Sequence, residues 1–332
     1  MKTKIGTAIT MCAMATSLFI ASCSNSSNKT ESTSETHEHQ HGEGDHHEHI
    51  FACPMHPEVT GKEGDKCPKC GMALEHIDEV PATGNFQMQF TSSPQIIEAD
   101  NPVTLAFTPK NKDNPNAVVP LDMEHEKKLH LILVSEDLSW FNHIHPDYQT
   151  DGTYSVAETF PNGGNYILYA DYKPSGSTHQ LEKINVEVKG KTIPAKTFTK
   201  TINTAVSDAY SITLKPDDGI FIANKAIHFD GVFTNEGKPF DVNQLQNHLG
   251  AKGHMVAINI ETKEYVHLHP EVEGTVLHFH TTFENAGIYR AWLQFMADGK
   301  LHTVDFVINV EKGQVKTTET QHDHNNHSDH KH

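Results

Sequence analysis

The chain has 332 residues, of which 36% are hydrophobic, and this length suffices for two or three compact domains. The formal net charge of −17 disfavours nucleic acid as a partner, because a protein that binds a phosphate backbone needs clustered Lys and Arg. The 26 histidines are the most informative feature of the composition, since imidazole is the commonest metal ligand among side chains.

The N-terminal residues 1–22 are typical of an export signal. Two lysines precede an uncharged, mostly apolar run over residues 5–21, which is shorter than the ~20 residues of a membrane-spanning helix. The run ends in Ile-Ala-Ser-Cys, which resembles the lipobox of bacterial lipoproteins. This resemblance implies cleavage before Cys23, lipidation of its sulfur, and a mature protein anchored in the cell envelope, at the outer membrane or on the periplasmic face of a membrane. An ordinary cleaved signal is the alternative.

Two polar segments carry much of the histidine. Residues 23–50 end in "HEHQHGEGDHHEHI", with six histidines, and residues 313–332 end in "QHDHNNHSDHKH", with five. Neither segment has a core-forming pattern, so we expect a disordered linker and a disordered tail. Such tails would be weak chelators that raise the local concentration of metal, or they would simply keep the protein soluble.

A small cysteine-rich module is predicted over residues 51–79. It contains two chelating pairs, Cys53-x-x-His56 and Cys67-x-x-Cys70. A set of three thiolates and one imidazole matches tetrahedral ligation of zinc or copper(I). Thioethers add affinity only for a soft ion, and two lie beside these pairs, in Met55 and Met72.

The same stretch resembles a known family, the heavy-metal-binding domain of copper-transporting P-type ATPases and of periplasmic adaptors of metal-efflux pumps. The residues that carry the resemblance are "CPMHP" at 53–57 and "CPKCGM" at 67–72. The resemblance implies binding of copper, as Cu(I), or of a related heavy metal, and transfer to an efflux pump or transporter. The alternative is a zinc knot with a role in folding alone, because so small a module needs a staple.

The rest of the chain contains an internal repeat, over residues 86–190 and 205–312. The segment "LHLILVSEDLSWFNHIHPD" (129–147) aligns with "GHMVAINIETKEYVHLHPE" (253–271). Each copy has a His-x-His-Pro motif and a further histidine 13 residues before it. Matched landmarks at a nearly constant offset indicate duplication.

Both copies are made of short alternating runs broken by Gly, Pro and Asn, with little helical periodicity. This pattern predicts a mainly β protein with two tandem immunoglobulin-like β-sandwich domains, smaller barrels being the alternative.

The repeated histidines predict a metal site in each copy. Residues i and i+2 of a strand share a face, so the two histidines of each motif project together. A hairpin centred between residues 137 and 138 places His130 opposite His145, and one centred between 261 and 262 places His254 opposite His269. Opposed Cβ atoms lie ~5 Å apart, close enough to share an ion. Three or four imidazoles suit Cu(II) or Zn(II). The predicted quartets are His130, His143, His145 and His179, and His254, His267, His269 and His302. The alternative is a structural role, with imidazoles bonded to loop carbonyls.

Five other histidines are less specific. His278 and His280 share a strand face and, with His228, could extend the second site. His125 and His248 precede the quartets at different distances. Exposed strand histidines account for all five.

An enzyme is the main competing class. His267-x-His269 followed by Glu273 resembles the first ligand group of a cupin metalloenzyme, but the first copy has Gln149 in place of the acid. The repeats lack the cysteine of a blue-copper site, and the chain lacks a Gly-x-Ser-x-Gly elbow. We therefore expect a binding protein, not an enzyme: an exported, membrane-anchored lipoprotein that sequesters or hands off copper or zinc. A surface adhesion lipoprotein with structural zinc is a third class.

Overall fold

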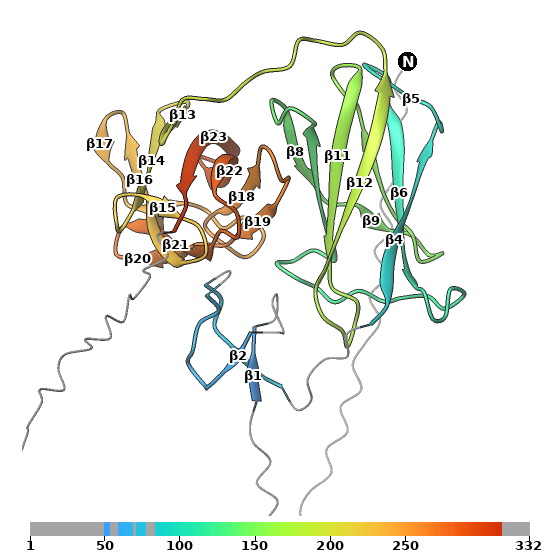
Figure 1. The fold of residues 1–332 in the computed structure, drawn as a ribbon, viewed down its shortest axis with the longest axis horizontal. Helices are drawn as coiled ribbons and strands as arrows, with labels where there is room; N and C mark the ends of the chain where they lie inside the picture. The colour runs from blue at the N-terminus through green and yellow to red at the C-terminus, as the bar shows by residue number, and fades with distance from the viewer. Residues whose placement is uncertain (1–49, 54–58, 69–70, 78–83, 314–332) are drawn as a thin grey trace, which may run out of the picture. The chain divides into compact units, whose positions relative to one another are not determined.

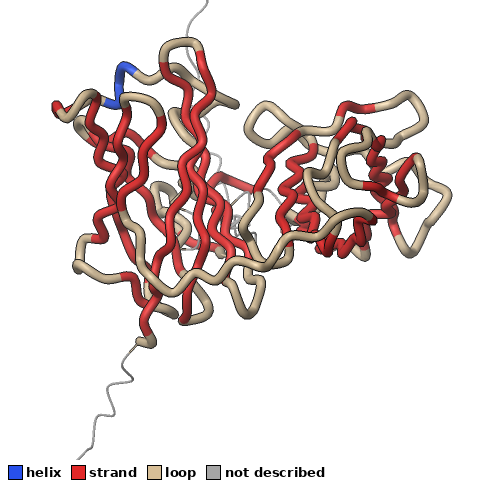
Figure 2. The backbone as a smooth tube through the Cα atoms, turned by 90° about the horizontal axis from the view of Figure 1, so that it is seen from above, coloured by secondary structure: helices blue, strands red, loops and turns tan. Residues whose placement is uncertain are grey.

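The computed structural model describes residues 50–53, 59–68, 71–77 and 84–313 (Figure 1). The predicted signal peptide, Cys23, nearly all of the His-rich linker and tail, and the candidate ligands Met55, His56 and Cys70 lie outside the described residues. The regular structure described is all strand apart from one 3-10 turn, Val242–Gln244, drawn blue in Figure 2. The described residues contain no helix long and apolar enough to cross a membrane. The predicted mainly β class is confirmed.

The Cys module, residues 50–77, is a three-stranded antiparallel sheet in the order β2-β1-β3. Its strands are β1 (Ile50–Ala52), β2 (Thr60–Gly61) and β3 (Glu75–Ile77). Cys53 and Cys67 are both buried, in one cluster with Leu74, so folding brings these two members of the predicted chelating pairs together. The turn after Cys67 is closed by the amide of Gly71, which donates to the Cys67 carbonyl over 2.8 Å.

The first sandwich, residues 86–189, has two sheets with the strand orders β4-β6-β10-β9 and β5-β12-β11-β7-β8. The strands are β4 (Phe86–Ser93), β5 (Ile97–Glu98), β6 (Val103–Asn111), β7 (Leu129–Ser135), β8 (Phe141–Ile144), β9 (Asp147–Tyr148), β10 (Tyr154–Glu158), β11 (Gly164–Tyr172) and β12 (Gln180–Lys189). Alternate residues of the strands fill the space between the sheets, such as Leu105 and Phe107 of β6 against Leu131 and Leu133 of β7.

The second sandwich, residues 204–311, repeats this strand order in β14-β16-β21-β20 and β15-β23-β22-β18-β19, and adds β13 and β17 at one sheet. Its elements are β13 (Thr204–Ser207), β14 (Tyr210–Pro216), β15 (Phe221–Ile222), β16 (Ala226–Asn235), β17 (Lys238–Pro239), β18 (His254–Asn259), β19 (Tyr265–Leu268), β20 (Glu271–Glu273), β21 (Val276–Thr282), β22 (Gly287–Ala297) and β23 (Lys300–Glu311). Two tandem sandwiches with the same topology are therefore present, as predicted.

Strands β7 and β18 are buried on both faces. One face of each lies in the core of its own sandwich. On the other face, Ile132 and Val134 of β7 share a buried apolar cluster with Val256 and Ile258 of β18. This second burial explains why these strands read as continuous apolar runs in the sequence rather than as alternating ones.

Two aromatic pairs take part in this shared cluster in a reciprocal arrangement. Phe141 stacks on Trp292 with ring centroids 4.5 Å apart, and Tyr169 stacks on Tyr265 at 5.0 Å. Phe141 and Tyr265 occupy equivalent positions in the two copies, as do Tyr169 and Trp292, so each sandwich offers the same surface to the other. Self-complementary contact of this kind is what a two-fold interface between identical subunits shows.

Candidate metal centre

Two hairpins position the repeated histidines. The β7–β8 ladder pairs Leu131 with Ile144, and the β18–β19 ladder pairs Met255 with Leu268. One step further along each ladder, His130 faces His145 and His254 faces His269. This is the register predicted from the sequence.

The first triad consists of His130, His143 and His145. Nδ1 of His130 lies 3.4 Å from Nε2 of His143 and 3.2 Å from Nε2 of His145. The second triad consists of His254, His267 and His269. In each triad the three nitrogens that could bind an ion lie within 4.8 Å of one another.

Backbone carbonyls fix the tautomer of the first histidine in each triad. Nε2 of His130 lies 3.0 Å from the carbonyl oxygen of Glu124, and Nε2 of His254 lies 2.8 Å from that of His248. A carbonyl only accepts hydrogen bonds, so each Nε2 carries the proton and donates it. Nδ1 of both histidines therefore keeps its lone pair, directed into the triad.

The first histidine of each His-x-His motif is held by the opposite sandwich. Nδ1 of His143 donates to Oε1 of Gln294 over 2.8 Å, and Nδ1 of His267 donates to Oδ2 of Asp171 over 3.1 Å. Asp171 is the β-ladder partner of His130, and Gln294 is the partner of His254. The two acceptors therefore occupy equivalent positions in the two copies, and each binds a histidine of the other copy. Metal-bound histidines typically donate their second nitrogen to such an oxygen.

The inward nitrogens of the second triad are left without partners. Among the described residues, Nδ1 of His254, Nε2 of His267 and Nε2 of His269 are buried with no hydrogen bond. Buried polar atoms are nearly always paired, and an unexplained exception needs a reason. A metal ion bound by all three lone pairs would supply it.

The two triads adjoin each other, and a seventh histidine joins them. The ring centroid of His267 lies 5.6 Å from that of His130 and 5.9 Å from that of His143. His125 of the first sandwich stacks on His269 of the second at 3.6 Å, with its Nε2 buried and unpaired among the described residues. The sequence does not predict His125 as a ligand, because this residue has no counterpart at the same spacing in the second copy.

Burial lowers the pKa of five of the six triad histidines. Desolvation, reinforced by the neighbouring histidines, lowers the pKa of His130 to about 4, of His145 to about 3 and of His254 to about 2. The same causes hold the pKa values of His143 and His269 well below the ordinary value. Only neutral imidazole binds a metal ion, so these five histidines are ready to ligate at neutral pH.

A buried ion pair stands behind the second triad. Burial alone would raise the pKa of Asp171, but the charge of His179 and hydrogen bonds from His179 and His267 hold it well below its usual range. Burial alone would lower the pKa of His179, and Asp171 raises it. The hydroxyl of Tyr265 also donates to Asp171, over 3.2 Å. His267 is thus backed by a carboxylate, whereas His143 is backed by a neutral amide.

The structure corrects the predicted fourth ligands. His179 contacts Asp171 and so reaches the second triad only through that carboxylate. His302 is paired with Phe295 on β22, where residues alternate between faces, while the neighbouring Gln294 points to the triads. The His302 ring stacks on Phe295 at 4.9 Å, and its Nδ1 lies 3.0 Å from Oγ of Ser207. The quartets are therefore triads.

Comparisons with known proteins agree with this division of the chain. Residues 50–77 match the model of the heavy metal binding domain family, which supports the predicted metal-binding module. Residues 79–190 and 204–312 each match the model described as "Domain of unknown function (DUF8832)". A copper-transporting P-type ATPase of Rhizobium leguminosarum bv. viciae is 53% identical over 32 residues, which make up 10% of this chain and only 4% of the ATPase.

Among solved structures, the Escherichia coli adhesin FdeC is similar at 14% identity and a TM-score of 0.25, covering 69% of this chain and 65% of the adhesin chain, a little under two thirds. A two-domain fibronectin type III segment of chicken tenascin is similar at 10% identity and a TM-score of 0.19, covering 68% of this chain and 98% of the segment.

The lowered pKa values predict acid sensitivity of the metal-free protein. As pH falls from about 6.5 towards 4, the unfolded chain takes up protons at His130, His145 and His254 while the folded chain does not, so stability falls. A histidine whose pKa is lower by 1 in the folded chain costs about 1.4 kcal/mol of stability at a pH below both of its pKa values. Urea unfolding of chelator-treated protein between pH 7 and 4.5 measures this fall. A His254→Gln variant should show a shallower fall, and an equal fall in both proteins would contradict the assignment.

The carboxylate behind His267 predicts that the second triad is the stronger site. Asp171→Asn keeps the shape and an acceptor but removes the charge, and loss of such a supporting group typically weakens metal binding about 10- to 100-fold. Competition of Zn(II) against a chromophoric chelator measures the affinity. Asp208→Asn, which removes an exposed carboxylate paired with Lys300, is the matched control. Equal affinities in the two variants would contradict this role of Asp171.

Proposed function

We propose that this chain, which belongs to the family defined by the domain of unknown function DUF8832, is an exported, membrane-anchored protein that binds copper or zinc for sequestration or hand-off. Its metal would be held at two kinds of site, the paired triads between the sandwiches and the Cys module. The observation that carries the proposal is the reciprocal bonding of His143 and His267 across the interface. Each of these bonds places the proton on Nδ1, so the lone pair of Nε2 is directed into the triad. A histidine with a structural role alone does not need this orientation.

The donor atoms favour particular ions. Nitrogen-only sites of neutral imidazole suit Cu(II) and Zn(II), and the thiolates of the module, with the thioether of Met72, suit Cu(I) and Zn(II). Copper is the first candidate, because the module is similar to part of a copper-transporting ATPase. That similarity also supports a metal-efflux pump or transporter as the partner.

The surroundings of the triads favour storage over catalysis. A catalytic metal site keeps an open position for water or substrate. Here four of the six triad histidines are buried, and each triad adjoins histidines of the other. The cupin-like ligand group does not assemble either. Glu273 is exposed on β20, and its carboxylate lies 4.0 Å from Nδ1 of His278 on β21. We therefore propose a binding protein and not an enzyme.

Export and anchoring complete the proposal. They rest on the signal-like residues 1–22 and the lipobox-like Cys23. A lipid anchor would keep the metal-binding domains at a membrane of the envelope, where a pump could receive the ion. The two His-rich segments would then act as loose collectors for the tighter sites.

Metal counting on the full mature chain tests the proposed centre. A His143→Ala/His145→Ala variant leaves a single inward histidine in the first triad, so it should retain less Cu(II) per chain after dialysis against a weak competing chelator. Asp208→Asn, which removes an exposed carboxylate paired with Lys300, is the matched control and should retain as much as the unchanged protein. Equal retention by the double variant and the unchanged protein would contradict the proposal.

A further inference from the structure

We infer that His228, His278 and His280 form a third metal site on the second sandwich, separate from the triads. These residues lie on β16 and β21, in the sheet that does not carry the triads. The inference goes beyond the proposed function, which assigns no role to this sheet.

The strand ladder brings the three rings together. β16 and β21 pair with His228 directly opposite His280 and with Asp230 opposite His278. The rings of His228 and His280 stack with centroids 4.1 Å apart. Nδ1 of His228 lies 3.2 Å from Nε2 of His278, so two possible ligand atoms already face each other.

A carboxylate orients His278 as Asp171 orients His267. Nδ1 of His278 donates to Oδ1 of Asp230 over 2.9 Å, which leaves the lone pair of Nε2 directed at His228. A second carboxylate, that of Glu273, lies 4.0 Å from the same Nδ1. The pair of acids makes this position favourable for a cation, and the carboxylate–histidine contact is the support that metal sites use.

The imidazole of His280 lacks a hydrogen-bond partner among the described residues. Both of its ring nitrogens are buried, and neither has a hydrogen-bond partner in the part of the chain that the structure describes. At least one of them carries a lone pair that burial has removed from water. Because the stacked rings direct their lone pairs nearly parallel, a rotation of the His280 ring would be needed for it to share an ion with His228.

The fold does not require these residues. In the first sandwich the corresponding ladder, β6 with β10, pairs Ala157 with Thr104 and Ser155 with Ala106. The same strands thus form with Thr104, Ala106, Ser155 and Ala157 where the second sandwich has His228, Asp230, His278 and His280. All four metal-type side chains occur in one copy only, which is expected of a site and not of a structural element.

The Cys module lies against this sheet. The side chain of Lys66 bonds to Glu271 on β20 over 2.6 Å, and Oγ1 of Thr282 on β21 donates to the Pro68 carbonyl over 2.8 Å. A Cβ on Gly71 would lie 2.8 Å from the Cβ of His280, so the turn that follows Cys67 approaches His280 as closely as only glycine allows.

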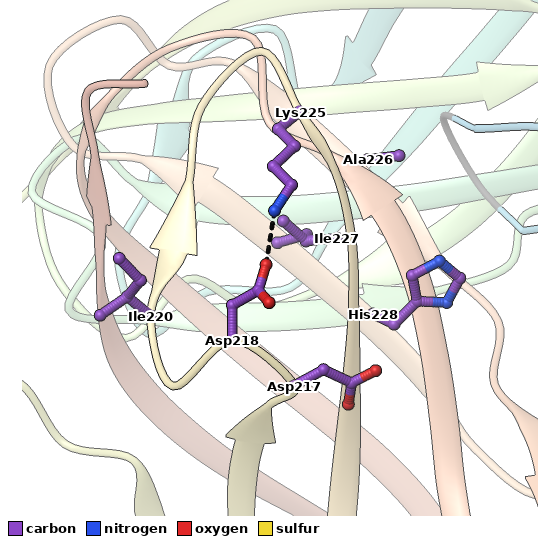
Figure 3. A pocket seen from close by; sticks show the side chains of 7 residues that line it. All are labelled: Asp217, Asp218, Ile220, Lys225, Ala226, Ile227 and His228. Atoms are coloured by element: carbon purple, nitrogen blue, oxygen red, sulfur yellow. Dashed lines mark hydrogen bonds and ion pairs between the residues drawn. The ribbon is translucent and has the colours of Figure 1, made fainter. Parts of the chain in front are cut away.

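The site is also reachable from solvent. His228 is exposed and lines one edge of a surface hollow of about 200 Å³, on the side away from the Lys225–Asp218 ion pair (Figure 3). Three imidazoles suit Zn(II), Cu(II) or Ni(II). An ion here would stand between the module and solvent, where imidazole nitrogen could exchange with thiolate sulfur without a change in the oxidation state of the ion.

The residues of the first sandwich supply the test. We expect a full-length mature chain with His228→Thr, His278→Ser and His280→Ala to bind one Zn(II) fewer per chain than the unchanged protein, in a titration with Zn(II) alone against a chromophoric chelator. The His143→Ala/His145→Ala variant should keep this ion and lose metal at the triads instead, so the two proposals fail separately. An unchanged count in the triple variant would overturn the inference.

A milder variant guards against misfolding. Asp230→Asn removes no ligand, and we expect it to weaken binding of this one Zn(II) about 10- to 100-fold while leaving the other ions unaffected. Circular dichroism should show unchanged β structure. Unaltered binding of all ions in Asp230→Asn would equally overturn the inference.

Discussion

Two hydrogen bonds that cross between the sandwiches determine the chemistry of the whole centre. Asp171 of the first sandwich accepts from His267 of the second, and Gln294 of the second accepts from His143 of the first. Each bond sets a tautomer, orients a ring and joins one sandwich to the other. The metal-type geometry and the domain interface are consequently one structure, and neither triad is fully oriented by a single copy.

The apolar contacts around the centre explain why four of its seven imidazoles are buried and the other three are half-buried. The cluster that Ile132 and Val134 share with β18 lies on the same strand face as His130, and stacked aromatic pairs take part in it. Burial lowers the pKa of six of the seven imidazoles, so these six remain neutral ligands, but it also leaves lone pairs of the second triad unsatisfied. A bound ion would relieve that cost. The metal-free protein is thus less stable than it would be with paired groups at this position, but its metal site is already assembled.

The sequence predicts the two histidine hairpins well but predicts the contact between the two sandwiches poorly. Because side chains alternate along a strand, His143 and His145 lie on one face. His130 and His145 are equally far from the turn, so the spacing alone predicts that they lie opposite each other in the β7–β8 hairpin. The turn gave no signal, because Leu138 adopts a left-handed φ of 58° without being Gly or Asn. His302 was wrongly included because spacing alone does not reveal which face of β23 a residue occupies. The contacts between the sandwiches are signalled in the sequence only by the missing alternation of β7 and β18.

The most direct test of the central claim is anomalous X-ray diffraction from crystals of the full mature chain loaded with Zn(II), recorded on both sides of the zinc absorption edge. The account predicts anomalous density bounded by Nδ1 of His130 or His254 and Nε2 of the paired His-x-His motif. Zinc density confined to other parts of the chain, with the triads empty at saturating metal, would contradict it.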